Sequence, residues 1–294
     1  MTVPPMIRSK KYVSAICLLA GLIAASTSRA AVIAYEGFEY EASENGLNNA
    51  SGGTGWANNW SAVNNDTVTP GLNYYSGGNQ LITSDGAARL DVANGGNFRS
   101  FAPAYATAAG TYWISFLSQV PNGTSYAGLS LFNSSNQEML FLGDTSGFTT
   151  WGMQTHGAGS TIFGSGLGVN NLAFIVARID FNVSGDTDNV RMWVNPGLTT
   201  QPLDGSATAA DLDISMNNGN AMTFDRIRIQ QGVGSDNAWF DEIRIGTTWA
   251  DVSPFEESPF VLPEPGTAGL FIVGALLYRS MRARRGMNLN LAAP

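Results

Sequence analysis

Short runs in which bulky apolar residues alternate with small or polar ones recur along most of this chain. Residues 112–120 have the sequence YWISFLSQV, and residues 238–245 have the sequence AWFDEIRI. A period of two puts alternate side chains on opposite faces of an extended strand, whereas a helix needs a period of 3.6 residues. Segments rich in glycine and asparagine separate the runs, as turns do between strands. The pattern predicts an all-β domain without long helices.

Further runs define the expected strands and their order. Strands are predicted at residues 129–132, 138–142, 172–183, 190–194 and 224–230. Polar segments at 133–136 and 184–188 are predicted to join neighbouring strands as hairpin loops. Residues 211–216 are expected to form a short turn at most. About a dozen short strands in one unit, residues 31–252, predict a jelly-roll β-sandwich.

The first 30 residues predict a secretory signal peptide. Arg8, Lys10 and Lys11 precede an apolar run at 12–25, and small residues then lead to Ala30. A positive start, a short apolar core and a small-residue exit are the three parts of such a signal. The apolar run is shorter than the roughly 20 residues of a membrane span, so an uncleaved anchor is the less favoured alternative. Cleavage would also remove the single cysteine of the chain.

The chain changes character after the predicted domain. Residues 253–262 are a proline-rich linker, which disfavours helix and sheet. An apolar run at 267–278 predicts a short transmembrane helix, and residues 286–294 are a short tail. Between them lies a cationic cluster, a membrane stop made of Arg279, Arg282, Arg284 and Arg285. A buried amphipathic helix is the alternative, and the absence of a polar face disfavours it.

This C-terminal segment resembles the PEP-CTERM sorting signal. The resemblance covers residues 261–285, where the apolar run and the arginine cluster follow Pro263, Glu264 and Pro265. The segment departs from the family pattern at Gly266, where serine or threonine is common, and in the residues that follow the arginines. The resemblance implies processing by an exosortase, a membrane enzyme of Gram-negative bacteria that produce exopolysaccharide. It implies export through the inner membrane, a transient membrane anchor, and a final place on the cell surface or in the extracellular matrix.

The central domain resembles the concanavalin A-like lectin/glucanase and laminin-G-like jelly rolls. Three parts carry the resemblance: the opening YEGFEY at 35–40 with GGTGW at 52–56, the hairpin at 177–196, and the closing WFDEIRIG at 239–246. The resemblance implies a fold and no particular activity, because function depends on the site that a fold carries.

The segment between the two ends is strongly acidic. Residues 31–262 contain seven arginines and no lysine, against 14 aspartates and eight glutamates, for a formal charge of −15. Binding of phosphate backbones needs clustered cations, so nucleic acid is not an expected partner. Solubility explains the acidic surface most simply, and cation binding is the alternative.

No catalytic centre is predicted. Glycoside hydrolysis needs two carboxyl groups beside the bond, and the Glu-x-Asp-x-x-Glu motif of the resembled glucanases is absent. Glu36, Glu39 and Glu41 share one face of the first strand and are interpreted as solvated edge residues. With His156 as the one histidine, neither a Ser-His-Asp arrangement nor a zinc site is expected. A glycanase-like enzyme on the same fold stays as the alternative.

Calcium is the ion that the sequence favours. Asp180, Asp186 and Asp188 gather with two asparagines around one hairpin. Carboxylate and amide oxygens are the hard ligands that Ca²⁺ takes. Asp241 would join this set if the last strand lay beside the hairpin. No motif requires a cofactor, and an acidic turn in water is the simpler interpretation.

Several aromatic residues lie in segments where loops are expected: Trp56, Trp60, Tyr74, Tyr75 and Trp151. Exposed rings beside asparagine and aspartate bind sugars by stacking, so these five are the candidate sugar-binding residues, although packing inside the domain is the favoured interpretation of the set. Trp113, Trp193 and Trp239 lie on predicted strands and are expected in the core. The sequence thus predicts a non-catalytic surface or matrix protein with exopolysaccharide as its ligand. A purely structural envelope protein is a further alternative.

Overall fold

A computed structural model describes most of the predicted domain. The described residues are 32–41, 46–62, 66–91, 96–101, 110–121, 125–146, 149–155, 161–181, 187–215, 222–232 and 237–257. The predicted signal peptide, sorting motif, membrane stop and tail lie outside these residues, as do Asp186 and His156. Within the described ranges, no helix combines the length and the apolar character needed to cross a membrane.

The larger of the two main sheets has eight strands. They are β1 (Ala34–Glu36), β3 (Thr67–Pro70), β6 (Gly86–Leu90), β8 (Gly110–Gln119), β13 (Ala173–Phe181), β14 (Thr187–Val194), β15 (Ala209–Ser215) and β17 (Ala238–Gly246). Their order is β15-β14-β13-β8-β17-β6-β3, and β1 pairs with β17 beside this path. All of the pairings are antiparallel.

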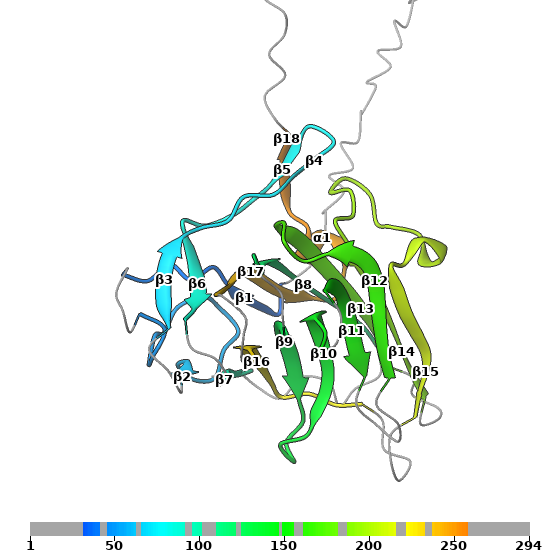
Figure 1. Cartoon of the computed structure of the whole chain (residues 1–294), viewed down its shortest axis with the longest axis horizontal. Helices are drawn as coiled ribbons and strands as arrows, with labels where there is room; N and C mark the ends of the chain where they lie inside the picture. The colour runs from blue at the N-terminus through cyan, green and yellow to red at the C-terminus, as the bar shows by residue number, and fades with distance from the viewer. Residues whose placement is uncertain are drawn as a thin grey trace, which may run out of the picture.

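The second main sheet has seven strands. They are β2 (Ser61–Ala62), β7 (Gly96–Ser100), β9 (Ala127–Phe132), β10 (Glu138–Asp144), β11 (Thr150–Thr155), β12 (Thr161–Gly168) and β16 (Arg226–Gln231). Their order is β12-β11-β10-β9-β16-β7-β2. Figure 1 shows this sheet and the eight-stranded sheet packed face to face as the two layers of a sandwich.

The main core lies between the two layers. Alternate residues of the long strands enter it, for example Ile114 and Phe116 of β8 and Ile227 and Ile229 of β16, none of which is exposed to solvent. This is the period of two seen in the sequence, with one face of each strand buried. The prediction of an all-β sandwich is confirmed.

A second apolar cluster covers the outer face of the eight-stranded sheet. Trp113 and Trp193 stack there with ring centroids 5.7 Å apart, and Trp249 meets Trp113 edge-on. Trp249 opens the four-residue helix α1 (Trp249–Val252). A small sheet completes this layer with strands β4 (Tyr75–Ser76), β5 (Asn79–Leu81) and β18 (Phe255–Glu257). The expectation of burial is confirmed for Trp113 and Trp193, whereas Trp239 of β17 is only partly buried.

Two local predictions are wrong. Residues 211–216 were expected to form a turn, but residues 211–215 belong to the edge strand β15, which pairs with β14. Trp151 was expected in a loop, but it lies in β11 and is 1% exposed. In both places polar and glycine neighbours suggest a turn, while pairing with an adjacent strand extends the backbone. Tertiary context overrides weak local preference in strands.

Candidate functional site

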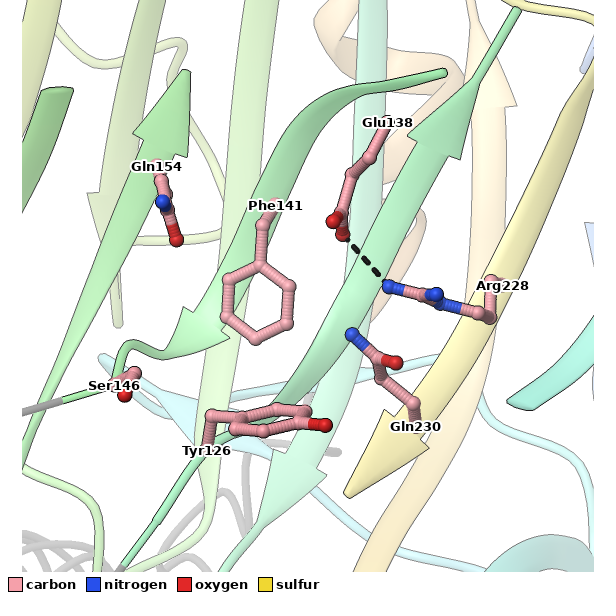
Figure 2. Close-up of a pocket in the computed structure, with 7 residues that line it drawn as sticks. All are labelled: Tyr126, Glu138, Phe141, Ser146, Gln154, Arg228 and Gln230. Atoms are coloured by element: carbon pink, nitrogen blue, oxygen red, sulfur yellow. Dashed lines mark hydrogen bonds and ion pairs between the residues drawn. The ribbon is translucent and has the colours of Figure 1, made fainter. Parts of the chain in front are cut away.

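A hollow on the outer face of the seven-stranded sheet is the best candidate for a ligand site. Its volume is about 270 Å³. The lining side chains come from strands β10, β11 and β16, from the residue before β9 and from the segment after β10: Tyr126, Glu138, Phe141, Ser146, Gln154, Arg228 and Gln230. Phe141 alternates with the core residues Leu140 and Leu142, so it points away from the sandwich interior. Figure 2 shows the seven side chains projecting from one face of the sheet.

Register aligns the wall of this hollow in one row across the sheet. Arg228 of β16 is opposite Ser130 of β9, and Ser130 is opposite Phe141 of β10. Phe141 is in turn opposite Gln154 of β11. Side chains that are opposite each other on neighbouring strands lie within contact distance. The row therefore presents a cation, a hydroxyl, a ring and an amide in succession.

The neighbouring row on the same face is almost free of side chains. Moving across the strands from β7 to β12, its members are Gly96, Gln230, Gly128, Gly143, Gly152 and Gly164. Only Gln230 carries a side chain there. A row of six strands spaced about 4.8 Å apart is roughly 24 Å long. The row is not open along its length, because Gly128, Gly143 and Gly152 are buried and the Phe141 ring lies over Gly128.

The lining of the hollow contains one ion pair, Arg228–Glu138, whose two charges neutralise each other. Arg228 Nη2 is 2.9 Å from Glu138 Oε1, as Figure 2 shows, and the Ser130 hydroxyl also donates to Glu138. The guanidinium lies over the Phe132 ring at 4.5 Å from its centroid. Burial lowers the pKa of Arg228 and Glu138 opposes this shift. The hollow thus offers donors and acceptors without a net charge.

Two rings give the hollow its apolar surface. Tyr126 and Phe141 meet edge to face, with centroids 6.3 Å apart and an interplanar angle of 78°. Phe141 is 4% exposed and forms the floor, while Tyr126 is half-buried at the rim. A Cβ at Gly128 would lie 2.6 Å from Phe141 Cζ, so the missing side chain makes space for the ring. Rings, amides and a neutral ion pair together suit a ligand with both hydroxyl groups and C–H faces.

A second hollow, of about 380 Å³, lies beside strands β3 and β6 and has fewer groups suited to ligand binding. It is lined by Glu39, Tyr40, Val68, Thr69, Pro70, Asp85 and Gly86. Its carboxylates, Glu39 and Asp85, are exposed. The hydroxyl of its one aromatic residue, Tyr40, donates to Glu36 at 2.7 Å. Its lining residues therefore include no amide side chain and no ion pair.

The predicted sugar-stacking residues do not form one site. Trp60 and Trp151 are each 1% exposed and Tyr74 is 9% exposed, so these three rings pack inside the domain, which is the interpretation favoured for the set. Tyr74 packs on Phe174 and donates its hydroxyl to the Pro196 carbonyl. Tyr75, in contrast, is 60% exposed on strand β4. None of the five lines the outer-face hollow.

Trp56 and Trp60 instead enclose a buried ion pair. Arg99 pairs with Glu36, and these two side chains are 3% and 1% exposed. The guanidinium lies 5.0 Å from the Trp56 ring centroid and 5.7 Å from that of Trp60. Trp60 Nε1 also donates to Glu36 at 3.0 Å. The interpretation of Glu36 as a solvated edge residue is wrong, whereas Glu39 and Glu41 are exposed.

The predicted calcium residues are also dispersed. Asp180 accepts from Arg178 and Arg191 at 3.0 and 3.3 Å, and from the Thr111 hydroxyl at 2.7 Å. Asp188 is fully buried and accepts the Met222 N–H. Two arginines on one carboxylate leave it poorly suited to a cation, because the positive charge is already present.

Asp241 does not join the hairpin. Strand β8 lies between β17 and β13, and Asp241 is opposite Leu117, whereas Asp180 is opposite Thr111 at the other end of β8. The strand of Asp241 therefore does not lie beside the hairpin, and Asp241 and Asp180 do not share a calcium site. No group of three or more His, Cys, Asp or Glu side chains that could hold a metal ion is found in the described part of the chain.

The outer-face hollow escapes prediction because its members are distant in sequence. Arg228 and Glu138 are 90 positions apart. The alternation at 224–230 correctly puts Arg226 and Arg228 on the face opposite the isoleucines. No local signal indicates that β16 lies beside β9, and so the partners of Arg228 need the topology. The glycine row has the same origin, since each glycine lies on a different strand.

No family model and no curated protein sequence matches this chain. Among solved structures, it is similar to the botulinum neurotoxin serotype D binding domain, with a TM-score of 0.45 and 13% identity over 76% of this chain and 49% of that one. It is also similar to domain 4 of a GH43 extracellular arabinanase from Geobacillus stearothermophilus, determined in complex with arabinotriose. That match has a TM-score of 0.46 and 12% identity over 76% of this chain and 97% of that one.

The chain spans about half the length of the neurotoxin domains that it matches. Overlaps with TM-scores below 0.5 assign neither a ligand nor an activity to this chain.

Proposed function

We propose that this protein is an exported, exosortase-sorted surface or matrix protein whose sandwich binds a neutral polysaccharide without hydrolysing it. The observation that carries the binding proposal is the hollow of about 270 Å³ on the outer face of the seven-stranded sheet. Its lining supplies two rings, two amides and the Arg228–Glu138 pair.

The charge balance favours neutral sugars over acidic ones. Arg228 is the one cation of the hollow lining, and Glu138 already neutralises it. A uronic acid would have to compete with Glu138 for the guanidinium. Hydroxyl groups, in contrast, can donate to and accept from the two glutamines, and sugar C–H faces can pack on Tyr126.

The same lining supports binding rather than hydrolysis. Glycosidases use two carboxyl groups about 5–9.5 Å apart on either side of the scissile bond. Glu138 is the single carboxyl group among the lining residues, and its ion pair and Ser130 hydrogen bond hold it in place. Release of reducing sugar by the purified protein would contradict this part of the proposal and favour the glycanase alternative.

Export and sorting rest on the sequence of the two ends. The N-terminal signal and the Pro263–Pro265 motif with its apolar run and arginines support a transient membrane anchor followed by exosortase processing. A bacterial polysaccharide on the cell surface or in the matrix is the ligand that this destination would provide.

A glycan array with the purified protein tests the binding proposal. We expect retention on neutral oligosaccharides and weaker retention on uronic acid chains. Tyr126→Ala and Gln154→Ala should each weaken binding about tenfold, the equivalent of about 1.4 kcal/mol. Tyr75→Ala is the matched control, because Tyr75 is an exposed tyrosine outside the hollow. Equal losses for Tyr75→Ala and Tyr126→Ala, or no glycan binding at all, would refute the assignment of this site.

A further inference from the structure

A cation and an anion lie side by side on the wall of the outer-face hollow. Figure 2 shows Arg228 of β16 and Glu138 of β10 pointing toward each other, with Arg228 Nη2 2.9 Å from Glu138 Oε1. Their side chains are 17% and 22% exposed, and both line the hollow. A sugar bound there would therefore meet both charges together, and removal of either one would leave the other facing it.

Two aromatic rings hold the guanidinium of Arg228 in place. It lies 4.5 Å from the ring centroid of Phe132 and 5.6 Å from that of Phe98. These rings meet edge to face, with centroids 5.3 Å apart. Register explains the arrangement, because Arg228 is opposite Phe98 of β7 on one side and opposite Ser130 of β9 on the other. Ring faces attract a cation, so the position of Arg228 does not depend on Glu138 alone.

Glu138 is held from two neighbouring strands. Its Oε1 accepts from Arg228 of β16 and from the Ser130 hydroxyl of β9. The register between β10 and β9 shifts between Glu138 and Leu140. Such an irregularity redirects side chains at the start of a strand. The carboxylate therefore has a defined place beside the guanidinium, set by the pairing of three strands.

Partial burial makes the cation in this wall dependent on an anion. Burial lowers the pKa of Arg228, Glu138 opposes the shift, and the buried Nε of the guanidinium has no hydrogen-bond partner. A partly desolvated guanidinium attracts a carboxylate more strongly than an exposed one, because the effective dielectric constant is lower. Glu138 supplies that carboxylate from within the protein. It thus takes the place that a carboxylate of a bound sugar would otherwise occupy.

We infer that the Arg228–Glu138 pair is the specificity-determining element of the hollow and excludes sugars that carry a charge of either sign. The carboxylate of a uronic acid is repelled by Glu138, and the ammonium group of an amino sugar is repelled by Arg228. Hydroxyl groups satisfy both partners, since they donate as well as accept. This role rests on the proposed function, because it concerns the hollow that would bind the polysaccharide, and it extends the exclusion to cationic sugars.

Reciprocal removal of the two charges tests this role. The Kd is measured at pH 6 for short chains of glucose, glucuronic acid and glucosamine, and for the same three forms of galactose and mannose. Glu138→Gln keeps an oxygen that can accept from Arg228, and it should raise affinity for uronic acid chains about tenfold relative to neutral chains. Arg228→Gln should do the same for amino sugar chains. The double variant, which removes both charges, should show neither gain.

Two controls separate the charge of the hollow from the charge of the whole protein. Glu39→Gln removes an exposed carboxylate outside the hollow and changes the net charge as Glu138→Gln does. Arg89→Gln is the match for Arg228→Gln, because Arg89 pairs with Asp91 and also lies outside the hollow. Both controls should keep the wild-type preference for neutral chains. If thermal unfolding shows that one single variant is not folded, the gain expected of the other still decides.

The outcomes distinguish this role from the proposed function. Wild-type binding to neutral chains, with no gain for charged sugars in either folded single variant, would overturn the role of the pair and leave the proposed function intact. Equal wild-type affinity for neutral and charged chains would also overturn the role. If neither the wild-type protein nor any variant binds a sugar chain, the proposed function itself is refuted, and the role of the pair with it.

Discussion

At the scale of single residues, buried carboxylates in this domain differ in how they are compensated. Glu36 accepts hydrogen bonds from the Phe38 N–H at 2.7 Å and from Tyr40 and Trp60, in addition to its pair with Arg99. Asp241 accepts backbone N–H groups of Leu72 and Glu242 at 2.8 and 2.7 Å. The first group is charged and fully paired, whereas the second has only neutral donors and a like charge beside it.

Removal of the Glu36 charge should therefore be costly. Glu36→Gln leaves Arg99 buried without an anion, and breaking a buried pair in this way costs about 3–5 kcal/mol. We expect a correspondingly lower free energy of unfolding in urea. Glu39→Gln makes the same change on an exposed residue of the same segment and should shift the free energy by less than about 0.5 kcal/mol. Similar unfolding midpoints for the two variants would show that Glu36 is not a paired interior charge.

The raised pKa of Asp241 predicts that the stability of the protein depends on pH. Burial first, and then the charge of Glu242, raises the pKa of Asp241 to about 9, whereas an unfolded aspartate has a pKa of about 3.9. Between these values the folded state holds a proton that the unfolded state has lost. The free energy of unfolding should therefore fall as the pH rises from about 4 to 9, and then level off.

Chemical unfolding at pH 5, 7 and 9 checks this prediction. The decline should be shallower in Asp241→Asn, which cannot ionise, and unchanged in the exposed control Asp85→Asn. Parallel pH profiles for wild type and Asp241→Asn would mean that Asp241 is ionised in the folded protein.

At the scale of elements, the glycine row consists of residues from strands that are far apart in the sequence. Gly143 has a φ of 148°, and a Cβ there would lie 2.3 Å from the Ala127 carbonyl oxygen. β10 and β9 therefore approach each other more closely than two strands with side chains at this level could. The tight pairing depends on the absence of side chains in this row.

Gly128→Ala tests the contribution of this row to strand pairing and to the position of the Phe141 ring in the hollow. The new Cβ would lie 2.3 Å from the Leu142 carbonyl oxygen and 2.6 Å from Phe141 Cζ, so the backbone and the ring must both move. Such overpacking costs about 1–3 kcal/mol, and the displaced Phe141 should also weaken glycan binding. Gly197→Ala is the control, because no atom lies within 4 Å of a Cβ at that position. Thermal unfolding and glycan binding should separate the two variants.

Strand positions were predictable where the period of two is strong. The runs at 112–120 and 238–245 are the strands β8 and β17, because one buried face imposes alternation locally. Packing was the favoured expectation for the aromatic residues of the loop segments, but which of them are buried was not predictable, since glycine and asparagine neighbours indicate a turn but not the direction in which a ring points. The outer-face hollow was not predictable either, because it depends on β16 pairing with β9 across a long sequence separation.

At the scale of the whole molecule, the described domain and the predicted sorting tail are separate in sequence. The last described strand ends at Glu257, and the Pro263–Pro265 motif follows it. We expect expression beside an exosortase to give a mature protein whose intact mass lacks the apolar run and the arginines. Replacement of Pro263 and Pro265 by alanine should retain the tail, while alanine at Pro254 should not. An identical mass with and without the exosortase would contradict the sorting proposal.

Strand β18 has a consequence for a protein held by its C-terminal side. It contributes three residues that pair only with β5 of the small sheet, while β17 lies between β8 and β6 inside the large one. A pull on the chain beyond Glu257 would therefore peel β18 and unwind α1 before it loads β17. The released segment, residues 247–257, has a fully extended length of roughly 36 Å, and its release would lengthen the connection while the sandwich stays folded. In flowing water or a swelling gel, this short strand would detach first under load and so limit the force that reaches the sandwich.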